Sequence, residues 1–111
     1  MPMKLVIAIV HDRDRQKMAD GLVRDGFRFT KLASTGGFLR EGNTTFLIAV
    51  EEEHVEGVLK VVDESSKSRE QYVNLLPPDA MAVGAFVANP VSVPVGGAVV
   101  FVLPIDRFEK Y

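Results

Sequence analysis

The chain has 111 residues, of which 47% are hydrophobic and 25% are charged, a composition typical of a globular domain. Its 13 basic and 15 acidic side chains give a net charge of −2, so no overall positive field exists for long nucleic acids. The lack of cysteine excludes disulfides and thiolate chemistry, and no apolar run is long enough to cross a bilayer. We expect a single cytoplasmic domain over residues 1–111, without a membrane or nucleic-acid partner.

Hydrophobic periodicity divides the chain into two strand-helix-strand halves followed by two further strands. Residues 3–10, 44–50 and 98–103 are apolar at both alternating sets of positions, which is typical of strands buried on both faces. Two glycines at 96–97 predict a two-residue hairpin between the last two strands. The expected elements, in chain order, are strand 3–10, helix 14–25, strands 27–34 and 44–50, a helix opening at 51, and strands 71–76, 91–95 and 98–103.

This order predicts an α+β fold, the ferredoxin-like βαββαβ sandwich with an extra C-terminal hairpin. In that fold two helices cover one face of an antiparallel sheet, and the other face is normally polar. Here the second face would also be apolar. An exposed apolar patch larger than roughly several hundred Å² is rare on a soluble monomer. We therefore expect the chain to assemble with copies of itself through the open face of the sheet.

Residues 34–43 contain three glycines, two large apolar side chains and an asparagine. Glycine permits positive φ and lets backbone amides approach a ligand closely, which suits a phosphate. Phe38 offers a flat surface for stacking a nucleobase, and Asn43 has a donor and an acceptor for a base edge. The glycines alone are more typical of a plain turn, because glycine and asparagine dominate turns for conformational reasons. Because exposed Phe38 and Leu39 usually mark a contact surface, we interpret the segment as a nucleotide-binding loop.

Other charged residues have structural explanations. Asp12 or Asp14 is a candidate N-cap for the first helix. The run Glu51–His54 places negative charge at the start of the second helix, where the helix dipole favours it. The histidines lack a second histidine, a cysteine or paired carboxylates at ligand spacing, so no metal site is expected. Residues 77–90, rich in proline and small side chains, predict a long functional loop that is poorly ordered without a ligand.

Four strings resemble the PII-like signal-transduction family known as PstA or DarA, whose members are receptors for cyclic di-AMP. They are IAIV.D.D at 7–14, FR.TKLA.TGGFLR.GNTTFL at 27–47, REQ at 69–71 and PV.V.VGGA.VFVLP.D.F at 90–108. The resemblance implies a PII-like homotrimer that binds the second messenger cyclic di-AMP in clefts between neighbouring subunits. It implies rearrangement of the loops at 35–43 and 77–90 on binding, with no enzymatic activity and no cofactor.

The resemblance also implies a set of ligand-binding positions. Arg28 and Thr30 would reach the ligand from the second strand, and Asn43 would read an adenine edge. The chain departs from the family pattern at Ala49, where a glycine is expected, and at Lys110, where relatives have another polar residue. The implied ligand-binding residues are Arg28, Thr30, Thr35, Gly36, Gly37, Phe38, Leu39, Asn43, Ala49 and Phe101.

Other functions remain open from the residues alone. An acylphosphatase-like enzyme also uses a ferredoxin-like sheet, and Arg28 and Asn43 fit the arginine and asparagine that it requires. Its phosphate cradle, however, directly follows the first strand, where this chain has no glycine. A PII-like ATP sensor would bind ATP instead. A sheet-surface RNA binder would need exposed aromatics and a basic face. The downstream protein target of a receptor is not readable from one chain.

Overall fold

The structure is a computed structural model, which describes residues 2–34, 42–73 and 91–111. Its elements are β1 (Met3–His11), the 3-10 turn η1 (Asp12–Asp14), α1 (Arg15–Arg24), β2 (Thr30–Ser34), β3 (Asn43–Glu51), the 3-10 turn η2 (Glu52–His54), α2 (Val55–Ser66), β4 (Arg69–Val73), β5 (Val91–Val95) and β6 (Ala98–Ile105). Within these ranges no helix is both long enough and apolar enough to span a membrane.

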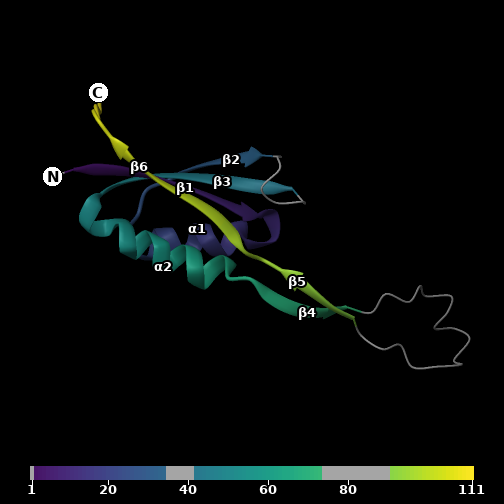
Figure 1. Cartoon of the computed structure of the whole chain (residues 1–111). Helices are drawn as coiled ribbons and strands as arrows, with labels where there is room; N and C mark the ends of the chain where they lie inside the picture. Colours follow the sequence, from purple (N-terminus) through teal and green to yellow (C-terminus); the bar gives the residue numbers. More distant parts are fainter. Residues whose placement is uncertain (1, 35–41, 74–90) are drawn as a thin grey trace, which may run out of the picture.

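Four strands form an antiparallel sheet in the order β2-β3-β1-β6, and both helices lie against one of its faces (Figure 1). The predicted α+β ferredoxin-like arrangement is therefore confirmed. β1 is central, as its continuous apolar sequence predicts, because it pairs with β3 on one side and β6 on the other. The two termini lie close together at one end of the sheet.

The core lies between the helices and the sheet. Side chains from alternating positions of β1 and β3 meet apolar side chains of α1 and α2 there, and the Phe29 ring packs on Phe46 with centroids 5.3 Å apart. Gly21 allows close approach of the helices, because a Cβ at this position would lie 2.9 Å from Val61 Cγ1. The buried apolar residues are Val6, Ala8, Val10, Met18, Ala19, Leu22, Phe46, Ile48, Val50, Val58, Val61 and Val62.

The second strand begins later than the predicted residue 27. Gly26 has φ +80°, and its N–H donates to the Val23 oxygen while the Phe27 N–H donates to the Leu22 oxygen, 2.8 Å away. This is the Schellman pattern that ends helices. Phe27 is thus tied to the end of α1, and the chain joins the sheet only at Thr30. The apolar alternation across 27–29 reflects packing on the core, not strand pairing.

The strands beside the glycine pair at 96–97 do not form a hairpin with each other, so this prediction is wrong. β5 pairs with β4 and β6 pairs with β1, which makes the extra hairpin a β4-β5 ribbon extending from the sandwich (Figure 1). Gly96 and Gly97 have φ of +79° and +93°, and the Gly97 N–H donates to the Ser66 oxygen. The pair redirects the chain from ribbon to sheet. The predicted loop at 77–90 lies outside the described residues.

The sheet face opposite the helices, called the open face here, is apolar but only partly covered. Ile7 in β1 is in register with Leu47 on one side and Phe101 on the other, and Phe101 is 39% exposed. Leu32 and Leu103 are exposed to 51% and 42%. The alternation therefore correctly predicts apolar side chains on both faces, but the chain by itself buries only one of them.

Candidate functional site

A cleft of about 650 Å³ lies at the end of the sheet where β3 finishes, in the size range of small-molecule sites. Two predicted ligand-binding residues, Arg28 and Ala49, line it, and both are exposed. Phe27, His54 and Phe108 contribute rings to the same cleft. An exposed guanidinium beside the flat rings of Phe27 and Phe108 provides a donor group for an anion and apolar surfaces for a base.

Two further predicted residues, Thr30 and Phe101, lie on the open face. Thr30 is in register with Leu47, which is in register with Ile7, and Ile7 is in register with Phe101. The four side chains therefore form one row across the sheet, with the predicted ligand-binding residues at its two ends. Both end residues are exposed in the single chain, so they are available to a ligand or to another subunit.

Asn43 is placed differently from these residues. It begins β3, is 2% exposed, and is in register with His11 and Ser34. It lies at the opposite end of β3 from Ala49, about 20 Å away at the usual rise of a strand. The structure thus separates Asn43 from the cleft with Arg28 within one chain.

The aspartates that follow β1 do not cap the first helix with their side chains, so their predicted role is wrong. Asp14 occupies the N-cap position of α1 without a side-chain cap hydrogen bond, and its Oδ1 instead accepts from Arg69 Nη2 at 3.0 Å. The Asp12 Oδ1 accepts from the Thr44 hydroxyl at 2.8 Å. Both carboxylates are used for long-range contacts, which a local capping pattern does not reveal.

No role was assigned to Arg69 from the sequence, in which it appeared only as part of the string REQ at 69–71. It is 55 positions from Asp14, and neither residue lies in a pattern that indicates the other. The predicted residues Thr35, Gly36, Gly37, Phe38 and Leu39 lie outside the described residues, so their roles stay predictions.

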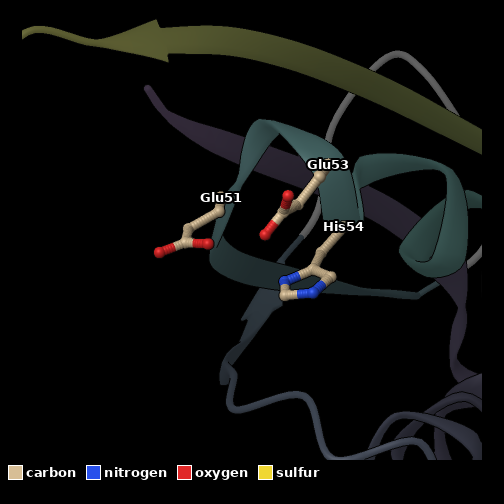
Figure 2. Close-up of side chains that lie close together, drawn as sticks. All are labelled: Glu51, Glu53 and His54. Atoms are coloured by element: carbon tan, nitrogen blue, oxygen red, sulfur yellow. The ribbon is translucent and has the colours of Figure 1, made fainter. Parts of the chain in front are cut away.

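Glu51, Glu53 and His54 come together at the start of α2, with potential ligand atoms within 4.8 Å of one another (Figure 2). Glu53 and His54 are exposed, and Glu51 is partly buried. Negative charge is favourable at the N-terminal end of a helix, which accounts for the two carboxylates without an ion. His54 also packs near the Phe27 ring, with centroids 6.4 Å apart. The expectation that neither histidine lies near paired carboxylates at ligand spacing is therefore wrong for His54, although the arrangement is also compatible with the helix-opening role predicted for the Glu51–His54 run.

Comparison with known proteins gives one family and several structures. Residues 3–111 match the family model described as cyclic-di-AMP receptor. The structure of a functionally unknown protein from Pediococcus pentosaceus ATCC 25745 is 44% identical, with TM-score 0.80, covering 100% of this chain and 99% of that one.

Two structures of lower identity share the fold. Arabidopsis thaliana PII bound to citrate has 18% identity and TM-score 0.59, covering 93% of this chain and 74% of that one. CPII from Thiomonas intermedia K12, bound to ADP, AMP and acetate, has 20% identity and TM-score 0.57, covering 94% and 86%. At these identities the likeness shows a PII-like fold.

Proposed function

Because the chain belongs to the cyclic-di-AMP receptor family, we propose that it is a cytoplasmic receptor that binds cyclic di-AMP between the subunits of a homotrimer. The observation that carries this proposal is the cleft lined by Arg28 and Ala49 at the edge of an incompletely covered apolar sheet. A signalling receptor of this kind has its effect through a downstream protein, whose identity the proposal leaves open.

The separation within β3 supports a site shared between subunits. Arg28 and Ala49 lie at one end of the strand and Asn43 at the other, about 20 Å away. A ligand bound at Arg28 would have to extend about 20 Å along the sheet to reach Asn43 of the same chain. In the proposed trimer, the Asn43 end of one subunit approaches the Arg28 cleft of its neighbour, so that each ligand contacts two chains.

The open face supports assembly for a separate reason. The row through Thr30, Leu47, Ile7 and Phe101 presents mostly apolar side chains, and neighbouring rows add Leu32 and Leu103. A contiguous group of exposed apolar side chains is typical of an interface. In the proposed trimer the open faces pack around the three-fold axis, which buries the central rows and leaves the sheet edges to the ligand.

Several of the implied residues have a proposed chemical role in this site. The Arg28 guanidinium pairs with a phosphate, and the Thr30 hydroxyl donates to another phosphate oxygen. Glycine amides of the 35–43 segment complete the anion site, Phe38 stacks on one base, and the Asn43 amide pairs with an adenine edge. Binding is proposed to rearrange the 35–43 and 77–90 segments, which is the signal that a downstream protein reads.

Calorimetry of the purified full chain against cyclic di-AMP, cyclic di-GMP and ATP tests the proposed function. The expected result is saturable binding of cyclic di-AMP at one molecule per subunit, with much weaker binding of the other two. Preferential binding of ATP would replace the proposal with a PII-like ATP sensor. An absence of cyclic di-AMP binding at any accessible concentration would refute it.

Base selection is tested by two substitutions. Asn43→Ala removes the donor and acceptor, and a mismatched polar group costs roughly 1–3 kcal/mol, so cyclic di-AMP should bind more weakly and lose part of its advantage over cyclic di-GMP. Phe38→Ala removes stacking, worth ~1–3 kcal/mol per base, with little change in that advantage. Because Asn43 is buried, thermal unfolding of each variant must accompany the titration. Unchanged affinity and preference in Asn43→Ala would make Asn43 a structural residue.

A further inference from the structure

The turn η1 contacts the ends of two chain segments that are far apart in sequence. Asp12, at the start of η1, forms hydrogen bonds with Gly42 and Thr44 at the end of the glycine-rich segment. Asp14, at the end of η1, forms an ion pair with Arg69, the first residue of the β4-β5 ribbon. We propose that η1 couples these two segments, with Asp12, Asp14 and Arg69 as positioning residues. The ligand-dependent part of this inference rests on the proposed function, whereas the coupling in the free protein does not.

The contact on the glycine-segment side consists of two hydrogen bonds and one close approach. The Asp12 N–H donates to the Gly42 oxygen at 3.0 Å, and the Asp12 carboxylate accepts from the Thr44 hydroxyl at 2.8 Å. A Cβ at Gly42 would lie 2.5 Å from Asp12 Oδ2, so no larger residue fits without displacing the carboxylate. The position of Gly42 and Thr44 is thus tied to that of η1.

The contact on the ribbon side is an ion pair with a buried acid. Arg69 Nη2 donates to Asp14 Oδ1 at 3.0 Å, and the Asp14 side chain is only 4% exposed. The second carboxylate oxygen of Asp14 is buried and accepts no hydrogen bond from the described residues. Moving Arg69 away would leave a buried carboxylate without its charged partner, which is strongly unfavourable. The first strand of the ribbon is therefore restricted to positions from which Arg69 reaches Asp14.

The end of the second ribbon strand, β5, lies against the same Arg69 guanidinium. Arg69 Nη1 donates to the Lys67 oxygen at 3.1 Å, and Gly96 packs directly on Arg69. A Cβ at Gly96 would meet Arg69 Nη1 and would lie 2.8 Å from the Lys67 oxygen. With φ of +79°, this position favours glycine on conformational grounds as well. Both strands therefore leave the sandwich in contact with Arg69.

The two contacts are adjacent within one compact turn. Asp12 and Asp14 are separated by a single residue, and the Arg15 backbone N–H and Nη1 both donate to the Asp12 oxygen, the latter at 3.1 Å. A displacement of Gly42 or Thr44 therefore moves η1 as a unit and changes the distance from Asp14 to Arg69. Thermodynamic coupling is reciprocal, so a change at Arg69 must also alter the residues beside Asp12.

Hydrogen exchange on the full chain without ligand tests the coupling in both directions. Asp14→Asn and Arg69→Gln should increase exchange in residues 69–73 and also in residues 42–46. Thr44→Val, which removes only the hydroxyl donor to Asp12, should increase exchange in residues 69–73. Asp20→Asn, the same chemical change at an exposed position of α1 where the carboxylate accepts from Gln16 at 2.9 Å, should change neither segment.

A purely structural ion pair gives a different pattern. If Asp14→Asn and Arg69→Gln loosen residues 69–73 while residues 42–46 keep wild-type exchange, the inference is overturned. The double variant should resemble Asp14→Asn, whereas Arg69→Gln alone should loosen the segments more, because it leaves the buried Asp14 carboxylate without its charged partner. Should the neutral variants fail to fold, Arg69→Lys keeps the charge but loses the planar fork, and partial loosening of both segments is then expected.

Calorimetry with cyclic di-AMP extends the test to the ligand. Asp14→Asn should weaken binding by about tenfold, within the usual range of coupling between sites, and ligand should no longer slow exchange in residues 69–73. Wild-type affinity in a variant whose ribbon has loosened would show that the ribbon is not coupled to the ligand. If wild-type protein itself does not bind, the proposed function fails, while the exchange experiment without ligand still decides whether η1 couples the two segments.

Discussion

The two faces of the four-stranded sheet are both apolar in sequence but differ in what covers them. On the helix side, Val6, Ala8 and Phe46 are completely buried beneath α1 and α2. On the open face, Ile7 and Leu47 are only partly buried, and Phe101 is 39% exposed. Apolar residues at both alternating positions of a strand therefore indicate that both faces of the sheet are shielded from water. They do not indicate whether helices of the same chain or another subunit cover each face. Substitutions on the two faces separate cover by the helices of the same chain from cover by another subunit.

Removing the largest side chain on the helix side should have the greatest effect on the stability of the chain. Phe46→Ala should lower the free energy of unfolding by about 3–5 kcal/mol, because a buried ring is replaced by a cavity. Val102→Ala in β6, which is on the same face as Phe46 but 43% exposed, should cost about 1 kcal/mol or less. Denaturant titrations at one fixed protein concentration measure both. A loss below about 1 kcal/mol for Phe46→Ala would contradict the burial described for this face.

A charge on the open face should affect assembly more than the fold of the chain. Ile7→Glu places a carboxylate in the middle of the row between Leu47 and Phe101, where a neighbouring subunit would have to bury it. Light scattering should show the wild-type protein at three times the chain mass and this variant at the chain mass, with unchanged far-UV circular dichroism. Ile7→Val should remain assembled. A wild-type monomer at micromolar concentration would refute the proposed trimer.

Changing the exposed cation at the edge of the open face should affect binding alone. Arg28→Gln should weaken cyclic di-AMP binding by about tenfold to a hundredfold, since a hydrogen bond to a charged group contributes about 1.5–3 kcal/mol. Its unfolding midpoint and assembled mass should match wild type. Lys60→Gln, at an exposed position on α2, provides the control. Unchanged affinity in Arg28→Gln would remove the cleft from the proposed site.

The smallest effect is expected for an exposed apolar residue outside the sheet. Val23 lies on α1 and is 68% exposed. Val23→Ser should change the free energy of unfolding by no more than about 0.5 kcal/mol, as for most surface positions, and should leave the assembled mass unchanged. A fall in assembled mass would mean that the outer side of α1 is also covered by another subunit.

The strands were largely predictable because the alternation that defines them is local. Residues 3–10 and 44–50 closely match β1 and β3. The start of β2 was not predictable from alternation, since hydrogen bonds hold Phe27 to the end of α1. The pairing beside Gly96 was also wrong, because a glycine pair indicates a change of direction but not which strand the chain joins next.

The candidate site was predictable to the extent that its residues share a segment or a strand face. Arg28 was implied as a ligand-binding residue by the family resemblance, and the structure puts it in the cleft. The link from Asp14 to Arg69 was not predictable, because it depends on how η1 and β4 meet in space. The sequence pattern instead predicted that Asp12 or Asp14 caps α1, since an aspartate before a helix normally accepts hydrogen bonds from backbone amides.

The ribbon leaves and rejoins the sandwich at a single point, where the Gly97 N–H donates to the Ser66 oxygen. Residues 67–96 thus form an excursion with its ends held together, and each doubling of such a loop costs only about 0.6 kcal/mol in closure entropy. Insertions or deletions that keep the contacts of Arg69 and Gly96 need not disturb the sheet or its helices. The remainder of the excursion can therefore be lengthened or replaced while the four-stranded sheet and the proposed ligand cleft keep their structure.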